Sequence, residues 1–398
     1  MKQLQNWALG ALMMIIIAGC SSAGIGDYRR EIGPGITNYG DSNLSLLQQK
    51  VSRLAAGGHE VLSVTQFGDS HSAADFFTGE LRTQLQARFG NAGIGWVTPM
   101  DVRGQRHAEV TWRSQNWQLI NSRTDDHPAY PMGGYVARST KAGGYIDLLP
   151  RNSMSPHESW NIRMVVREEV PESLSLYSTF GRTNITLPLK SNSWQIVKMK
   201  GALPFKLVAG EKGIEVGGFW LQRANRPGAI VSSIATNGAQ LSIWNRWSPE
   251  WTAELAATES DLVILEYGTN EAFNDRLDKD LYRQNLVASI RKIRQRLPNA
   301  VILMVGPGDA LLRDASGKCV DRQPPSYKIV KAVQKSVARS EHTLYWDWQM
   351  AMGGKCSIDQ WEAESLAGRD KVHLTGAGYR LSAKMLYKDL MQLLNVRH

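Results

Sequence analysis

A serine stands where a predicted buried strand gives way to a predicted helix. The strand covers Val61 to Phe67, and the segment Phe67-Gly68-Asp69-Ser70-His71-Ser72 follows directly from it. Open α/β sheets place reactive groups at the carboxyl ends of strands, where a helix N-terminus supplies positive potential and free N–H groups. Ser70 is therefore a candidate nucleophile. The competing interpretation is a serine that only caps the helix.

A base and an acid that could activate this serine stand close together near the C-terminus. The segment Arg369-Asp370-Lys371-Val372-His373 precedes the last predicted helix. An acid three residues ahead of a histidine on one loop can present both side chains to one cleft. His373 would then take the serine proton, and Asp370 would orient the imidazole and stabilise its charged form. The alternative is a histidine on a surface loop.

Two further segments at strand ends could stabilise negative charge on an ester oxygen. Asn270 follows the predicted strand 261–267, and a side-chain amide there can donate to an oxyanion. Gly238 follows the predicted strand 229–234, and a glycine lets its backbone N–H approach a ligand closely. Each signal is weak alone, because Asn and Gly end many strands for turn reasons.

The two neighbours of the serine are interpreted as structural. Adjacent residues at a strand-to-helix turn point apart, and Asp370 with His373 already fills the role of the base. His71 is therefore expected to pack or to form a local hydrogen bond, and Asp69 is expected to stabilise the turn.

Strand and helix patterns on both sides of a β-rich stretch must position these residues. Helices are expected over 41–54, 74–89, 249–257, 278–296, 326–340 and 377–394, and further strands over 300–305 and 343–348. Between 101 and 228, short alternating runs separated by Gly, Asn and Ser turns predict an all-β module of sandwich or jelly-roll type. The fold class is therefore α/β, with a discontinuous domain over 41–100 and 229–398 that is interrupted by an inserted β domain over 101–228.

The N-terminus is predicted to be an export signal over 1–19, followed by a tether over 20–40. Lys2 is positive, and the apolar run from 7 to 19 is too short to span a bilayer, which takes about 20 residues. The ending Ile17-Ala18-Gly19-Cys20 resembles a bacterial lipobox, which implies a lipid anchor on Cys20. By resemblance to known lipoproteins, Ser21 in place of an Asp favours an anchor in the outer membrane, facing the periplasm. The alternative is a buried N-terminal helix with a chance cysteine.

The two other cysteines and the charge also bear on the environment. Cys319 and Cys356 form an even pair in the exported part and are predicted to form a disulfide, the alternative being two unrelated thiols.

The formal net charge is +9, the basic residues are scattered along the chain, and no nucleic-acid-binding motif appears. An anionic glycan or membrane surface is therefore a better partner than nucleic acid. No zinc-ligand spacing such as His-Glu-x-x-His occurs, so no metal or cofactor is expected.

Together the four segments resemble the four signature blocks of the SGNH (GDSL-type) hydrolase superfamily, in the same order. Ser70 matches the first block, Gly238 the second, Asn270 the third, and Asp370 with His373 the last. The resemblance implies a flavodoxin-like three-layer αβα fold and ester hydrolysis without a cofactor. It also implies an oxyanion hole made by the N–H groups of Ser70 and Gly238 and the Asn270 amide.

Departures from the usual pattern narrow the resemblance. Typical members have Leu where His71 stands and Asp where Glu271 stands, and here a β module separates the first two blocks. These features look like the Ape-type peptidoglycan O-acetylesterases, which carry an inserted domain similar to a carbohydrate-binding module. The resemblance implies removal of acetyl from the C6 hydroxyl of N-acetylmuramic acid in O-acetylated peptidoglycan, through an acetyl-serine intermediate. The alternatives are an acetyltransferase acting on a glycan, a non-catalytic glycan-binding lipoprotein and, less favoured because of the β insert, a lipase.

Five tryptophans of the expected β domain are candidate platforms for sugar rings. Most are expected to be core residues, and no more than one or two are expected to contact glycan. They are Trp112, Trp117, Trp160, Trp194 and Trp220.

Overall fold

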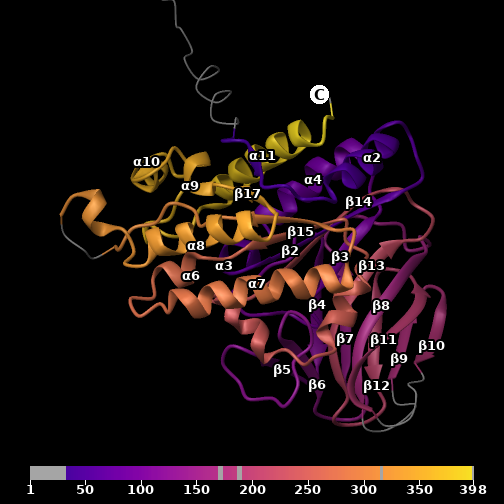
Figure 1. Cartoon of the computed structure of the whole chain (residues 1–398). Coiled ribbons are helices and arrows are strands. Elements are labelled where there is room, and N and C mark those ends of the chain that lie inside the picture. The colour runs from indigo at the N-terminus through magenta and orange to yellow at the C-terminus, as the bar shows by residue number, and fades with distance from the viewer. Residues whose placement is uncertain (1–32, 169–173, 186–190, 314–316, 397–398) are drawn as a thin grey trace, which may run out of the picture.

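The computed structural model describes residues 33–168, 174–185, 191–313 and 317–396 (Figure 1). The predicted export signal and Cys20 lie outside the described residues. Within the described ranges, no helix is long and apolar enough to cross a bilayer.

The α/β domain is built on a six-stranded sheet whose strands run in the order β1-β17-β16-β15-β2-β14. All neighbours pair in parallel except the edge strand β1, which is antiparallel to β17. The five parallel strands follow the chain order 2-1-3-4-5 of flavodoxin-like folds, as the sequence predicts. The strands are β1 (Ile36–Asn38), β2 (Val61–Gly68), β14 (Gly228–Ala235), β15 (Leu262–Glu266), β16 (Val301–Val305) and β17 (Leu344–Trp346).

Helices cover both faces of this sheet and make three layers (Figure 1). Alternation along β15 shows the two faces: Leu262 and Ile264 pack with α2, α4 and α11, while Val263 and Leu265 pack with α5, α7 and α8. Because neither face meets water, the strands are mostly apolar, and polar side chains within them, such as Thr65, Gln66 and Ser232, are buried. The helices are α2 (Leu44–Ala55), α4 (Phe77–Phe89), α5 (Trp251–Ala256), α7 (Lys279–Arg296), α8 (Tyr327–Ser340) and α11 (Gly376–Leu393).

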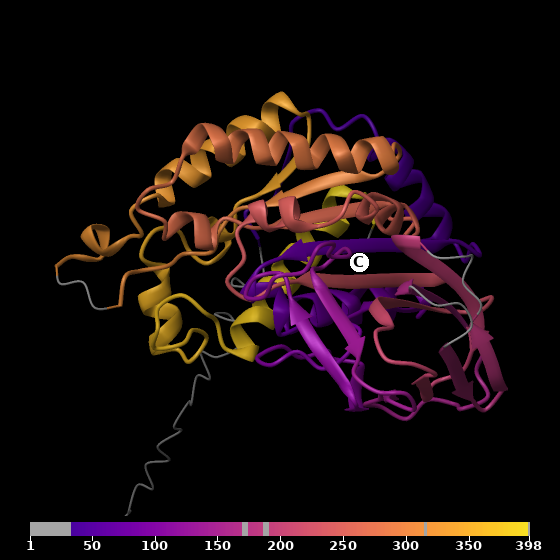
Figure 2. The ribbon, with the colours of Figure 1, turned by 90° about the horizontal axis from the view of Figure 1, so that it is seen from below.

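The β module consists of two antiparallel sheets that enclose a core of their own and lie on one side of the α/β domain (Figure 1, Figure 2). One sheet has the order β10-β9-β12-β7-β4, and the other has the order β11-β8-β13-β6-β5, with β3 also paired to β13. The strands are β3 (Gly93–Val97), β4 (Val110–Gln115), β5 (Trp117–Asn121), β6 (Tyr135–Ser139), β7 (Tyr145–Pro150), β8 (Trp160–Glu168), β9 (Leu174–Ser178), β10 (Gly181–Ile185), β11 (Ser191–Gly201), β12 (Phe205–Ala209) and β13 (Glu215–Arg223).

The module begins earlier than the expected boundary at 101. Strand β3 pairs in antiparallel register with β13, Trp96 opposite Trp220, so it belongs to the sheet of the β module. The sequence 93–97 is short and apolar like the strands of the other domain, and only its pairing partner, more than a hundred residues away, decides its place.

The tryptophans of the module serve its packing. Trp117, Trp160, Trp194 and Trp220 are all buried. Trp112 is half-buried, and its indole N–H donates to the Thr98 carbonyl at 3.1 Å. Four of the five therefore present no exposed ring to a sugar.

The helix expected over 74–89 begins three residues later, and a separate short helix precedes it. A short helix, α3 (Ser70–Ala73), begins at the serine itself, and α4 begins only at Phe77. Asp75 adopts a left-handed backbone conformation, with φ at 52°, and interrupts the helix. Its buried carboxylate accepts bonds from the Arg82 guanidinium at 3.0 and 3.1 Å and from the Ala108 N–H at 2.7 Å, which stabilises the break.

Candidate active site

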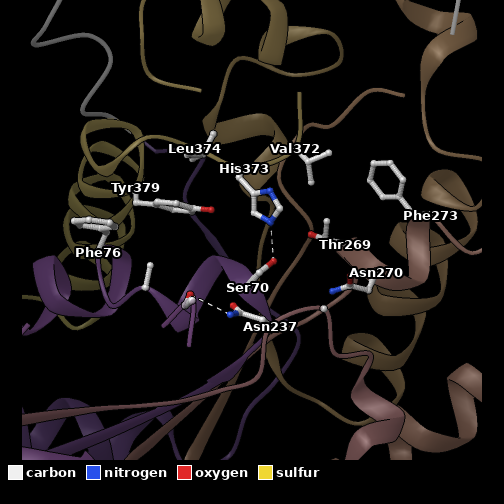
Figure 3. A pocket seen from close by; sticks show the side chains of 13 residues that line it. Ser70, Phe76, Asn237, Thr269, Asn270, Phe273, Val372, His373, Leu374 and Tyr379 are labelled. Atoms are coloured by element: carbon white, nitrogen blue, oxygen red, sulfur yellow. Dashed lines mark hydrogen bonds between the residues drawn. The ribbon is translucent and has the colours of Figure 1, made fainter. Parts of the chain in front are cut away.

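Three residues from distant parts of the chain meet at the carboxyl edge of the sheet. Ser70 Oγ lies 2.9 Å from His373 Nε2 (Figure 3). His373 Nδ1 lies 2.7 Å from Asp370 Oδ2. The structure therefore brings together all three residues of the predicted triad. A serine hydroxyl bonded to an imidazole that a carboxylate orients is the arrangement of an activated nucleophile.

Asp370 is held in its ionised form by the loop that carries it. Its Oδ1 accepts bonds from the backbone N–H groups of Val372 at 3.1 Å and His373 at 3.0 Å. Burial raises the pKa of Asp370, but the bonds from the His373 side chain and from these N–H groups outweigh that effect and leave the pKa below its ordinary value. The carboxylate is therefore available to stabilise a protonated imidazole.

The loop of the histidine is braced from a neighbouring helix, α10 (Ser357–Ala363). Lys371 Nζ lies 3.0 Å from Asp359 and 2.9 Å from Glu362, both on this helix. A disulfide joins Cys356, at the start of α10, to Cys319. The disulfide between the two predicted cysteines therefore anchors the helix that holds the loop of Asp370 and His373.

The backbone at the serine is shaped by its neighbours. The Asp69 Oδ1 accepts the His71 N–H at 2.9 Å and caps α3. Gly68 cannot carry a side chain, because a β-carbon there would lie 2.3 Å from Ser72 Oγ and 2.6 Å from Glu266 Oε2. The chain therefore packs closely against Ser72 and Glu266 where β2 ends, two residues before Ser70.

Both residues predicted for the oxyanion hole line the same cleft as Ser70. Gly238 has a φ of 67°, the left-handed conformation that favours glycine. The Asn270 side-chain amide donates to the Ala239 carbonyl at 2.9 Å and to Asp69 Oδ2 at 3.1 Å. An oxyanion that binds Asn270 must therefore share an amide hydrogen with one of these two oxygens or displace that oxygen.

A cluster of buried carboxyl groups lies behind the serine, and sequence reasoning found only part of it. Asp69, Glu266 and Glu271 are all buried. Glu266 Oε2 accepts a bond from Ser72 Oγ at 2.8 Å, and Glu271 Oε1 accepts the Leu241 N–H at 2.7 Å. The signal for Glu266 was a charged residue in an otherwise apolar strand.

Burial raises the pKa of every member of this cluster. Burial, with a contribution from repulsion by Glu271, raises the pKa of Asp69 to about 8. The hydrogen bonds from His71 and Asn270 lower this pKa and offset part of the rise. Burial also raises the pKa of Glu271 to about 7 and that of Glu266 well above its ordinary value. The cluster therefore holds protons near neutral pH, which limits repulsion among three acids that share one site.

His71 has the packing role expected of it. It is buried, its Nδ1 lies 2.9 Å from the Tyr379 hydroxyl, and its ring meets Trp348 edge-on at 5.3 Å. Burial, with repulsion from His373, lowers the pKa of His71 to about 3. A neutral His71 stays beneath the cleft, where it supports Tyr379.

The serine opens into a cleft of about 540 Å³. One part of the lining is apolar, and the rest carries the serine, the histidine and the two residues that could bind an oxyanion (Figure 3). The apolar side chains are Phe76, Phe273, Val372 and Leu374. Over the part of the chain that the structure describes, no cluster of three or more His, Cys, Asp or Glu side chains could hold a metal ion.

Comparison with known proteins gives two family matches. Residues 92–206 match "Peptidoglycan O-acetylesterase, N-terminal", and residues 216–381 match "GDSL-like Lipase/Acylhydrolase family". No curated protein matches the chain.

Solved structures give a close likeness over nearly the whole chain. A peptidoglycan O-acetylesterase is 34% identical, covers 91% of this chain and 99% of its own, and has a TM-score of 0.82. An acetyl xylan esterase is 17% identical over 41% of this chain and 81% of its own, with a TM-score of 0.32. A family two carbohydrate esterase from Cellvibrio japonicus is 11% identical over 72% of this chain and 99% of its own, with a TM-score of 0.30. The last two are too distant to support an inference.

Proposed function

This chain belongs to the peptidoglycan O-acetylesterase family and is a carboxylic ester hydrolase; from that premise we propose that it removes acetyl groups from the C6 hydroxyl of N-acetylmuramic acid in peptidoglycan. The observation that carries the proposal is the 2.9 Å contact between Ser70 Oγ and His373 Nε2 in an open cleft. A cleft that is open to solvent can admit one residue of a large polymer.

The first half-reaction transfers the acetyl group to the enzyme. His373 Nε2 takes the Ser70 proton while Oγ attacks the carbonyl carbon, and Asp370 stabilises the imidazolium that forms. The resulting oxyanion accepts bonds from the backbone N–H groups of Ser70 and Gly238 and from the Asn270 amide. When the carbonyl re-forms, the C–O bond to the sugar breaks, and His373 gives its proton to the departing C6 oxygen.

The second half-reaction returns the enzyme to its starting state. A water molecule gives a proton to His373 Nε2 and attacks the carbonyl carbon of acetyl-Ser70. The second tetrahedral intermediate uses the same three donors. Its collapse breaks the bond to Ser70 Oγ, which regains the proton from His373, and acetate leaves.

The location of the enzyme follows from its N-terminal sequence and its substrate. Peptidoglycan lies outside the cytoplasm, and the lipobox-like ending at Cys20 supports a lipid anchor in the outer membrane, facing the periplasm. We propose that the β module helps to bind the glycan, as a carbohydrate-binding module does.

One measurement separates hydrolysis from the acetyltransferase and binding-protein alternatives. O-acetylated peptidoglycan is incubated with the protein and with an unacetylated glycan acceptor, and both free acetate and acetylated acceptor are quantified. Hydrolysis predicts free acetate as the main product, whereas transfer predicts acetylated acceptor. A fluorophosphonate probe that fails to label Ser70, together with no product of either kind, would favour a non-catalytic glycan-binding protein.

A further inference from the structure

Three exposed arginines lie around the cleft, each from a different part of the chain. Arg106 and Arg380 both lie against Phe76, with their guanidinium carbons 4.9 Å and 5.8 Å from the centroid of its ring. Phe76 itself lines the cleft. These two arginines therefore mark one side of the opening, and the third, Arg123, lies elsewhere on its edge.

Arg123 comes from the β module and reaches the glycine expected to bind the oxyanion. A β-carbon built on Gly238 would lie 2.7 Å from the Arg123 Cζ and 2.9 Å from each of its terminal nitrogens. The guanidinium thus occupies the space that a side chain at position 238 would fill. The inserted module thereby contributes a positive charge at the edge of the site of the other domain.

The turn that carries Arg123 is fixed to the α/β domain. Arg246, at the end of the 3₁₀ helix η1 (Leu241–Arg246), donates to the Ser122 carbonyl and, at 2.9 Å, to the Asp125 carbonyl. The Arg123 N–H donates to Asn121 Oδ1 at 2.9 Å, which holds the turn itself. The position of Arg123 is therefore built into the contact between the two domains.

The loop that carries Arg106 is fixed in the same way. The Arg106 N–H donates to the Ala73 carbonyl at 3.3 Å, one turn from the serine. Two residues further on, the Ala108 N–H donates to the buried Asp75 carboxylate, which also binds Arg82. The left-handed break at Asp75 thus anchors the first cationic loop of the rim.

These arginines have no acidic partner in the structure. Among the described residues, no carboxylate lies within ion-pair distance of Arg106, Arg123 or Arg380, whereas other arginines such as Arg53, Arg82 and Arg223 are paired with carboxylates. The acids nearest in sequence to Arg123 are engaged elsewhere: Asp126 pairs with Arg246 at 3.3 Å, and Asp125 accepts the Asn121 N–H at 2.8 Å. The rim therefore keeps its positive charge.

We propose that Arg106, Arg123 and Arg380 form an anion-binding rim that holds carboxylates of the acetylated glycan strand, with Arg123 as the residue that sets the preference for an anionic substrate. A guanidinium binds a carboxylate through two parallel hydrogen bonds, which orients the ligand as well as attracting it. Because the rim surrounds the cleft of the nucleophile, an anion held there must be part of the same substrate. The inference rests on the proposed function, and it names the carboxylates as the feature of peptidoglycan that the enzyme recognises.

The test compares two probes that differ only in charge. One is a C6-acetylated disaccharide dipeptide from peptidoglycan with free peptide carboxylates, and the other is the same compound with those carboxylates converted to primary amides. For the full chain, kcat/KM is measured on both, and their ratio is the anionic preference. Arg123→Ala is expected to lower this ratio about ten-fold, and Arg123→Lys is expected to retain part of it.

The control is Arg182→Ala, an exposed arginine on β10 at the far edge of the module, which is expected to leave the ratio unchanged. A second measurement needs no variant: added salt is expected to lower kcat/KM for the anionic probe and to spare the amidated one. Equal loss on both probes in Arg123→Ala, or a wild-type ratio near one, would overturn the inference. Failure of the proposed function looks different, because the wild type would then release acetate from neither probe and from no peptidoglycan.

Discussion

The Asn270 side-chain amide donates to Asp69 Oδ2 at 3.1 Å, so the predicted oxyanion donor is held in place by a buried carboxyl group. The same Asp69 caps the helix that begins at Ser70. One side chain therefore positions both the proposed nucleophile, Ser70, and the proposed oxyanion donor, Asn270.

Replacing Asp69 tests this coupling. An asparagine offers a single acceptor oxygen, so Asp69→Asn must give up the bond to either His71 or Asn270. We expect kcat to fall by about ten- to a hundred-fold with KM nearly unchanged, because the loss acts on the transition state. Steady-state acetate release measures both constants.

The matched control for Asp69 is Asp278, which caps α7 through two backbone N–H groups at 3.0 Å and is not one of the residues that line the cleft. Both N–H groups bond to the same oxygen, and asparagine caps helices about as well as aspartate. Asp278→Asn therefore keeps the cap and is expected to change stability by at most about 0.5 kcal/mol, with kcat preserved. Similar kcat values for wild type and Asp69→Asn would refute the positioning role.

The disulfide is expected to support both stability and catalysis. Replacing Cys319 and Cys356 together by Ser should lower the free energy of unfolding by about 2–4 kcal/mol, because a closed loop in the unfolded chain is released. Since α10 holds Lys371 beside the catalytic histidine, kcat should also fall several-fold.

Urea unfolding and acetate release on the same preparation check the two effects of the double replacement. A stable double variant with full activity would show that the cross-link has no part in holding the catalytic loop.

A buried glutamate predicts how stability varies with pH. Burial raises the pKa of Glu254 to about 8, although its Oε2 accepts the Met132 N–H at 2.9 Å. Between its ordinary pKa and about 8 the folded chain keeps a proton that the unfolded chain has lost, so stability falls as pH rises through this range.

Glu254→Gln removes that titration. As pH rises from 5 to 8, we expect the free energy of unfolding of the variant, relative to that of the wild type, to increase by at least about 1 kcal/mol. Thermal or urea unfolding at the two pH values measures the difference. The prediction is contradicted if the free energy of unfolding of the variant relative to the wild type stays constant from pH 5 to pH 8 or decreases.

Residues at the ends of predicted strands were accessible to sequence reasoning. Ser70, Asn270 and His373 each follow or precede an element whose period is clear, and the parallel sheet then brings them to one edge. The α/β class followed from the same pattern, whereas the family and the flavodoxin-like fold were implied by the resemblance of the four segments to the SGNH signature blocks.

Contacts between distant segments were not accessible in this way. The start of the β module at β3 depends on pairing with β13, and the position of Arg123 over Gly238 depends on how two domains dock. Glu266 could be seen as a charge in an apolar strand, but its proximity to Asp69 is a product of the tertiary fold.

The central claim is that Ser70 forms an acetyl intermediate during removal of acetyl from peptidoglycan. The most direct measurement is acetate release from O-acetylated peptidoglycan by the wild type and by Ser70→Ala, with circular dichroism to confirm that the variant folds. The account predicts release by the wild type and a loss of at least about 10⁴-fold in kcat for the folded variant. Release by folded Ser70→Ala at a rate near that of the wild type would contradict it.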